Sequence, residues 1–209
     1  DEQIGMVQTR WEHLNEDYSL MTQLQAFCLN AHFTIEQLGR HAQGHLINFN
    51  GTAGVWRKQC INEAGGWQSD TLTEDLDLSY RAQLKGWKFK YLEEVGTPAE
   101  LPVAMNALKT QQFRWTKGAA ECAKKNLSKV FKNPGLKRGT KIHATFHLLN
   151  SSMFIFVVLV SLLSLPLLYI KADFSQYAQI IMYFSFFLTG TVFLGLFYWF
   201  STGVKGLKP

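Results

Sequence analysis

The chain of 209 residues is 47% hydrophobic and carries a formal net charge of +5, which excludes an intrinsically disordered protein. The charge is unevenly distributed, because residues 1–109 hold nine Lys and Arg against fourteen Asp and Glu, whereas residues 110–209 hold twelve against two. The chain therefore has an acidic part and a basic part that meet near residue 110.

Strands alternate with helices in the acidic part, which predicts an α/β fold. The hydrophobic patterns predict strands at residues 6–11, 45–50 and 87–92, and helices at residues 18–38, 57–63 and 73–84. We expect Thr73 to cap the last of these helices, Gly86 to end it, and the small residues 51–54 to form a turn. Because these strands are too few for a doubly wound domain, we expect the chain to be part of a longer protein.

Two side-chain patterns predict what is buried in this part. Apolar residues at helical spacing within residues 18–38 indicate one buried face, made of Leu20, Leu24, Phe27, Cys28, Ala31, Ile35 and Leu38. The three cysteines, Cys28, Cys60 and Cys122, are far apart in the sequence, which argues against a zinc site or a disulfide framework. We expect all three thiols to be buried and reduced.

Two uncharged stretches, residues 151–170 and 177–200, are each long enough to cross a membrane as a helix. The short polar loop between them predicts a transmembrane hairpin, and the alternative is a pair of buried helices in a soluble protein. Nine Lys and Arg lie between residues 110 and 141, opposed only by Glu121. The positive-inside rule therefore places residues 1–142 and the C-terminus of this integral membrane protein in the cytosol.

The position of these basic residues also indicates a partner. Because they directly precede a membrane segment, anionic lipid headgroups are favoured over nucleic acid. The chain thus divides into a domain at residues 1–110, a basic interfacial segment at residues 111–142 and the membrane helices at residues 143–209.

The stretch TLTEDLDLSYR places Glu74, Asp75 and Asp77 in the first turn of a predicted helix. Acidic side chains there stabilise the helix dipole, and Asp77 can pair with Arg81 four residues later. By itself this pattern favours a structural role over catalysis.

The stretch QQFRW is more informative, because Gln111, Arg114 and Trp115 fall on one face of a helix. An amide, a guanidinium and an indole suit a sugar diphosphate, since Arg binds phosphate and a flat ring stacks on a pyranose. The alternative is an amphipathic helix on the membrane surface, anchored by Trp115. The residues alone leave both interpretations open.

Several short motifs follow one another along the chain. They are FNGTAG at 49–54, GGW at 65–67, TED at 73–75, AELP at 99–102 and QQFRW at 111–115, and the membrane segments come after them. This order resembles family 2 glycosyltransferases of the cellulose-synthase-like group, and it is most similar to the glucomannan and mannan synthase branch. The resemblance implies the acceptor-side half of a type A glycosyltransferase domain, a partial nucleotide-diphospho-sugar transferase fold. It covers essentially residues 1–142.

The resemblance also implies roles for single residues. Asp75 matches the general base that takes the proton of the acceptor hydroxyl during an inverting transfer, and Glu74 helps to shape the same site. Arg114 matches the residue that stabilises the departing diphosphate, and Trp115 matches the stacking platform for the acceptor sugar. The remaining substrate-binding positions implied by the motifs are Gln111, Phe49, Asn50, Gly51 and Thr52. Asn50 stands where cellulose synthases have Cys, so contacts with the acceptor are expected to differ.

The resemblance implies that the donor-binding half of the family, with the Asp-x-Asp motif that holds Mg²⁺ or Mn²⁺, lies upstream of residue 1. We therefore expect no metal site in this chain, and no activity from the chain alone. The implied donor is a UDP- or GDP-hexose and the implied acceptor a growing β-linked polysaccharide. Transfer of one sugar to a lipid and a non-catalytic membrane scaffold are the alternatives. Topology does not distinguish a bacterial inner membrane from the Golgi or another internal membrane.

Overall fold

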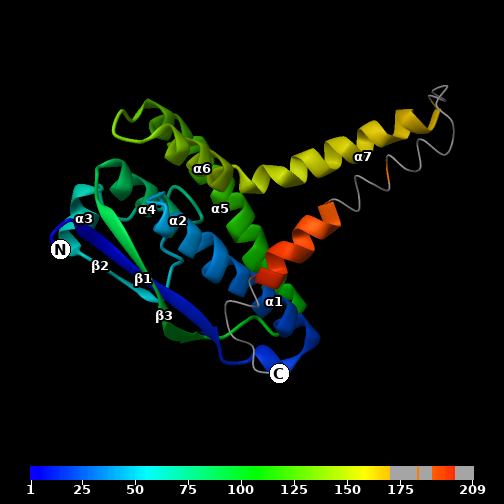
Figure 1. The fold of residues 1–209 in the computed structure, drawn as a ribbon, viewed down its shortest axis with the longest axis horizontal. Coiled ribbons are helices and arrows are strands. Elements are labelled where there is room, and N and C mark those ends of the chain that lie inside the picture. Colours follow the sequence, from blue (N-terminus) through cyan, green and yellow to red (C-terminus); the bar gives the residue numbers. More distant parts are fainter. Residues whose placement is uncertain (170–182, 184–189, 201–209) are drawn as a thin grey trace. The chain divides into compact units, whose positions relative to one another are not determined.

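A computed structural model describes residues 1–169, 183 and 190–200, and it forms two compact units, Asp1–Ser151 and Ser152–Pro209. The first unit confirms the α/β prediction (Figure 1). Its elements are β1 (Ile4–His13), η1 (Glu16–Tyr18), α1 (Leu20–Ala31), η2 (His32–Gln37), α2 (Leu38–Ala42), β2 (Gly54–Trp56), α3 (Lys58–Glu63), α4 (Glu74–Leu84), β3 (Lys88–Ala99), α5 (Met105–Lys132) and α6 (Arg138–Leu148).

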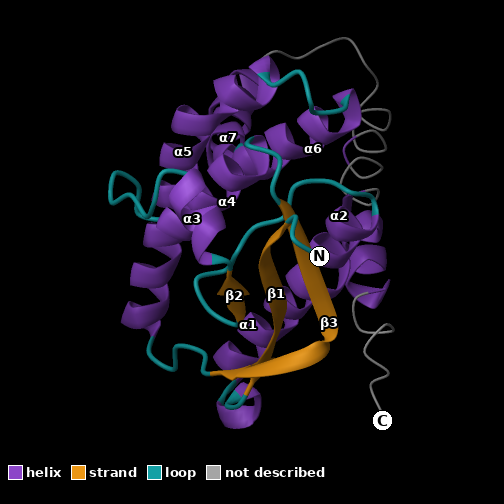
Figure 2. Cartoon of the chain, turned by 90° about the vertical axis from the view of Figure 1, so that its left-hand side faces the viewer, coloured by secondary structure: helices purple, strands orange, loops and turns teal. Residues whose placement is uncertain are grey.

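The three strands form one sheet in the order β2-β1-β3 (Figure 2). Strand β1 pairs antiparallel with β2, where Val7 lies opposite Val55, and parallel with β3, where Gln8 lies opposite Tyr91. The alternation of apolar and charged residues in 87–92 is confirmed, since Phe89 and Tyr91 are buried. Gly86, with a φ of +95°, follows α4 as predicted.

Two hydrophobic cores pack on opposite sides of α4. The first joins the sheet to α3, α4 and η2 and contains Met6, Phe33, Ile47, Phe49, Cys60, Leu78 and Phe89. The second joins α4 to α5 and α6 and contains Leu46, Tyr80, Cys122, Val130, Ala144 and Leu148. Leu78 and Tyr80 thus anchor α4 to both cores, so the helix that carries the TED motif is fixed on two sides.

The prediction of a strand at residues 45–50 is wrong. Side chains of α4 take the place of a neighbouring strand there: Ile47 donates its backbone N–H to Gln83 Oε1 (3.1 Å), and Gln83 Nε2 donates back to the Ile47 carbonyl (2.7 Å). Two residues on, the Phe49 N–H donates to Ser79 Oγ (2.9 Å). The extended segment satisfies its backbone without a sheet ladder, because two polar side chains of α4, Ser79 and Gln83, are buried beside it.

The buried face predicted for residues 18–38 is wrong over its first half. Leu20 is 71% exposed and Leu24 56% exposed, and Cys28 is exposed as well. The side chains that pack inward on α1 are the smaller Thr22, Ala26 and Ala31. Cys60 and Cys122 are buried as predicted.

The second unit contains the end of η3 (Asn150–Ser152), α7 (Met153–Tyr169) and a helix at Gly190–Phe200. Among the described residues no single helix is both long and apolar enough to cross a membrane, although Arg138–Leu148 and Asn150–Leu163 reach that length together as a bent pair. Much of the segment predicted at 177–200 lies outside the described residues.

Candidate active site

Asp75 lies in the first turn of α4, where its side chain is half-buried. Its Oδ1 accepts a hydrogen bond from the Leu76 backbone N–H (2.8 Å). Burial raises the pKa of the Asp75 carboxyl to about 6; the Leu76 N–H lowers it, the neighbouring Glu74 raises it, and Arg114 lowers it. A carboxyl group whose pKa lies near neutral pH can exchange a proton with a hydroxyl group under ordinary conditions.

The loop of the FNGTAG motif meets this carboxyl through Gly51. Gly51 adopts a φ of +78°, and a Cβ built on it would lie 3.2 Å from Asp75 Oδ2. A side chain at this position would be strained by the backbone and crowded by the carboxylate. Glycine therefore allows the loop to approach Asp75 closely.

Gln8 of β1 fixes this loop. It is fully buried, its Nε2 donates to the carbonyls of Thr52 (3.1 Å) and Ala53 (2.9 Å), and its Oε1 accepts from the Asn50 N–H (3.1 Å). Thr9 adds a hydrogen bond from its Oγ1 to the Ala53 carbonyl (2.8 Å). Sequence analysis missed Gln8, because a polar residue within a strand looks like a solvent-facing position.

Helix α5 brings the QQFRW motif to the start of α4. Gly118, one turn after this motif, is buried, and a Cβ built on it would lie 2.5 Å from Thr73 Cγ2. Thr73 occupies the N-cap position of α4, but its hydroxyl lies 3.4 Å from Cys122 Sγ instead of capping the helix as predicted. Close contact between the two helices thus replaces a side-chain cap.

The motif residues differ in exposure. Arg114 is exposed, while Gln111 and Trp115 are half-buried. Arg114 interacts electrostatically with Asp75, and its guanidinium forms no hydrogen bond within the described part of the chain. The guanidinium is therefore available to bind an anionic group beside the carboxyl of Asp75.

Asp77 has a structural role. It is fully buried, with Oδ2 accepting from Arg81 Nε (2.8 Å) and Lys125 Nζ (2.9 Å), and Oδ1 accepting from Asn126 Nδ2 (2.8 Å). The predicted pair with Arg81 is confirmed. Because both oxygens of Asp77 point to α5 and Arg81, only Asp75 and the exposed Glu74 are left to face a substrate.

Comparison with known proteins identifies the family. A family model described as "Glycosyl transferase family group 2" matches residues 1–201. The chain belongs to this family. It is 46% identical over 143 residues to "Probable glucomannan 4-beta-mannosyltransferase 4" of Oryza sativa subsp. japonica, an alignment that covers 68% of the chain and 26% of the relative.

A second relative, "Glucomannan 4-beta-mannosyltransferase 2" of Arabidopsis thaliana, is 41% identical over 143 residues, covering 68% of the chain and 27% of the relative. The chain thus spans about a quarter of the length of the curated relatives it matches. The resemblance drawn from the sequence motifs is confirmed.

The structure brings only some of the predicted site residues of this glycosyl transferase family group 2 chain together. Gly51 lies against Asp75, Arg114 interacts with it, and Glu74 adjoins it. The side chain of Phe49 instead belongs to the first core, where its ring packs edge-on against Trp56 (5.7 Å between centroids).

No described part of this glycosyltransferase chain offers a metal site, since it contains no group of three or more His, Cys, Asp and Glu suited to hold an ion. The sequence Asp75-Leu76-Asp77 does not form one either. The Asp77 oxygens are bound by Arg81, Lys125 and Asn126, so the two carboxylates cannot share an ion.

The close helix contact leads to a prediction for Gly118→Ala. The added methyl group overlaps Thr73, so α5 must shift, and a misplacement of about 1 Å in the motif can cost up to about 100-fold in activity. We expect kcat/KM of the whole protein to fall by more than about tenfold. The matched control is Gly39→Ala on α2, where nothing lies within 4 Å of the added atom; equal losses in both variants would contradict the prediction.

The pKa of Asp75 predicts the pH dependence of the reaction. With Asp75 as the general base, which acts in its ionised form, a pKa of about 6 predicts activity above that pH and a decline below it. We expect kcat/KM to fall about tenfold per pH unit once the pH is below this value. A profile that is flat down to about pH 4.5, near the ordinary range of a carboxyl group, would contradict this.

Proposed function

We propose that the chain forms the acceptor-side half of an inverting membrane glycosyltransferase, which transfers a mannosyl residue from a nucleotide sugar to a growing β-1,4-linked polysaccharide. The names of the relatives support the sugar and the linkage, since those with 41–46% identity are described as glucomannan 4-beta-mannosyltransferases. The observation that carries the catalytic part is Asp75, a half-buried carboxyl with a raised pKa between Gly51 and Arg114.

In the proposed reaction, the acceptor hydroxyl attacks the anomeric carbon of the donor while Asp75 takes its proton. The bond from the anomeric carbon to the phosphate oxygen breaks on the opposite face, and the nucleoside diphosphate leaves with the electron pair. Arg114 stabilises the negative charge that develops on this leaving group. Trp115, half-buried one position further along α5, supplies an aromatic face on which the acceptor sugar stacks.

We place residues 1–142 on the cytosolic side of a bacterial inner membrane or of an internal eukaryotic membrane. The uncharged stretches at 151–170 and 177–200 and the nine basic residues before them support this topology. One of these nine basic residues, Lys125, forms ion pairs with Asp70 and Asp77 and is therefore engaged within the domain. The exposed Lys124, Lys132 and Arg138 are the better candidates for contact with lipid headgroups.

The donor-binding residues and the divalent cation belong, in this proposal, to the part of the whole protein upstream of residue 1. Nucleotide sugar, polysaccharide and membrane lipids are then the partners. The alternatives are transfer of a single sugar to a lipid and a scaffold without catalysis.

The test uses the whole protein in membranes, supplied in turn with labelled GDP-mannose, UDP-glucose and UDP-N-acetylglucosamine, and the labelled product is sized. Long polymer from GDP-mannose supports the proposal. A product of one sugar on lipid would overturn the polysaccharide acceptor. Long polymer from another donor, or no incorporation from any of the three, would overturn mannose as the transferred sugar.

A further inference from the structure

A π-helical turn interrupts the long helical segment that precedes the FNGTAG loop. Residues Leu20–Ala42 are continuously helical, but η2, His32–Gln37, has π-helical geometry between α1 and α2. Such turns are rare and are found mostly as single bulges, frequently at functional sites.

The first residue of the turn connects it to the loop at the active site. His32 places Nδ1 2.9 Å from Glu36 Oε2, and Nε2 3.4 Å from Asn50 Oδ1. The second contact is long for a hydrogen bond. Both ring nitrogens therefore face oxygen atoms, Nδ1 that of the Glu36 carboxylate and Nε2 that of the Asn50 side-chain amide.

The side chains of Asn48 and Gln37 also help to hold the side-chain amide of Asn50 in place. Asn48 Nδ2 donates to Asn50 Oδ1 (2.7 Å), and Gln37 Nε2, from the end of the turn, donates to the Asn48 carbonyl (2.7 Å). Two nitrogen atoms, Asn48 Nδ2 and His32 Nε2, thus converge on Asn50 Oδ1. They leave Asn50 Nδ2 buried and without a partner in the described structure, so the orientation of the amide is set by its oxygen.

We propose that His32, oriented by Glu36, is a positioning residue for Asn50 and, through it, for the loop that contacts Asp75. Asn50 is bonded directly to Gly51, which lies against Asp75 Oδ2. The backbone of Asn50 is already fixed by Gln8, whereas its side chain depends on His32 and Asn48. The inference rests on the proposed function, because the loop is the part of the site assigned to the acceptor.

The π turn determines the relative directions of His32 and Gln37. His32 and Glu36 are four residues apart, and their pairing across the turn directs the imidazole out of the helix toward the loop. Regular α-helical winding would rotate the following residues relative to His32, and would separate Gln37 from its contact with Asn48. The turn therefore allows both residues to reach the loop from one helical segment.

The experiment measures initial rates of the whole protein with a β-linked oligosaccharide acceptor and a nucleotide sugar donor. For His32→Ala we expect the acceptor KM to rise about tenfold while the donor KM stays within about twofold, because only the acceptor loop is displaced. His32→Gln keeps a donor for Asn50 Oδ1, and should stay within about threefold of wild type in acceptor KM.

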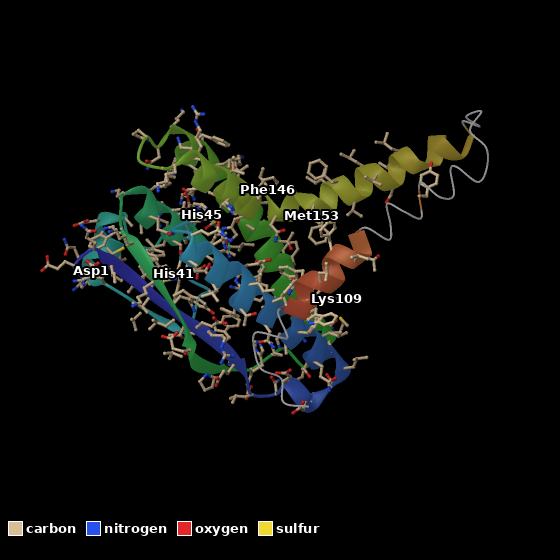
Figure 3. All side chains as sticks on the ribbon, viewed as in Figure 1. Asp1, His41, His45, Lys109, Phe146 and Met153 are labelled. Carbon is tan, nitrogen blue, oxygen red and sulfur yellow. The ribbon has the colours of Figure 1, made fainter. Side chains whose placement is uncertain are left out.

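His41→Ala is the matched control, because His41 lies on α2 of the same helical segment (Figure 3), and in the described structure its side chain forms no hydrogen bond or ion pair with the loop. It should leave both KM values unchanged. An acceptor KM that is unchanged in His32→Ala, or equal rises in donor and acceptor KM, would overturn this inference. A wild-type protein without acceptor-dependent transfer would instead overturn the proposed function.

If His32→Ala fails to fold, Glu36→Gln provides the second measurement. It removes the charge that orients the imidazole but keeps a side chain of the same size. An acceptor KM raised by about threefold, with the donor KM unchanged, supports the positioning role. A Glu36→Gln protein identical to wild type in both KM values would overturn it.

Discussion

Replacing Asp75 by Asn is expected to lower kcat of the whole protein by about 10³-fold at neutral pH, because an amide cannot take the proton of the acceptor hydroxyl. The substitution keeps the size of the side chain, and the amide oxygen can still accept from the Leu76 N–H. The donor KM should be little changed. The measurement is the rate of labelled sugar transfer, normalised to folded protein.

Although Asp75→Asn is expected to lower activity, it is not expected to lower the stability of the folded protein. Burial raises the pKa of Asp75 from 3.8 to about 6, so the folded state binds the proton more tightly than the unfolded state does. Stability therefore falls as the pH rises between these values, and ionised Asp75 opposes folding at neutral pH. We expect Asp75→Asn to unfold at a temperature no lower than that of wild type.

The matched control is Asp17→Asn, which removes an exposed carboxylate from the first turn of η1. It should leave kcat unchanged. Loss of activity together with a lowered unfolding temperature in Asp75→Asn would indicate a structural role. Transfer at the wild-type rate would remove Asp75 from the mechanism and favour the scaffold alternative.

The motifs themselves could be placed from sequence because local spacing determines them. Residues three and four apart share a helix face, so Gln111, Arg114 and Trp115 were expected on one helix, and α5 confirms this. Acidic residues at a helix start and a glycine at its end likewise located α4, Glu74–Leu84, to within one residue.

The contacts that assemble the site could not be predicted in the same way, because they join residues distant in the chain. Gln8 holds a loop more than forty positions away, and Gly118 matters only because Thr73 of another element lies beside it. The segment 45–50 carries the alternating pattern of a strand, yet Ser79 and Gln83 bind its backbone. Hydrophobic patterns report burial, and they do not identify which polar group satisfies the backbone.

The exposure of apolar side chains on α1 shows a related limit of prediction from sequence patterns. The apolar spacing of Leu20 and Leu24 correctly indicates a helix, but the face they form is exposed in the first unit, and the small residues Ala26 and Ala31 pack inward. Helical periodicity identifies an apolar face without identifying its partner.

Asp77→Ala is expected to destabilise the protein by about 3–5 kcal/mol, because it leaves the charges of Arg81 and Lys125 without their shared buried partner. Burial by itself raises the pKa of Asp77, but hydrogen bonds from Asn126, Lys125 and Arg81 outweigh it and lower the pKa below 3.8. The carboxylate therefore stabilises the fold above its ordinary pKa, and this contribution is lost as the pH falls through the lowered value. Denaturant unfolding followed by Trp fluorescence measures the effect.

The control for Asp77→Ala is a substitution of Asp70, which pairs with the same lysine. Asp70 also accepts from Lys125 Nζ (2.7 Å), but its side chain is 58% exposed whereas that of Asp77 is fully buried. Water can replace an exposed carboxylate, so Asp70→Ala should cost no more than about 1 kcal/mol. If the two variants lose equal stability, the buried network is not what joins α4 to α5. If Asp77→Ala alone is strongly destabilised, the last acid of the EDLD sequence, Asp77, maintains the fold, and Asp75 remains the candidate for the chemistry.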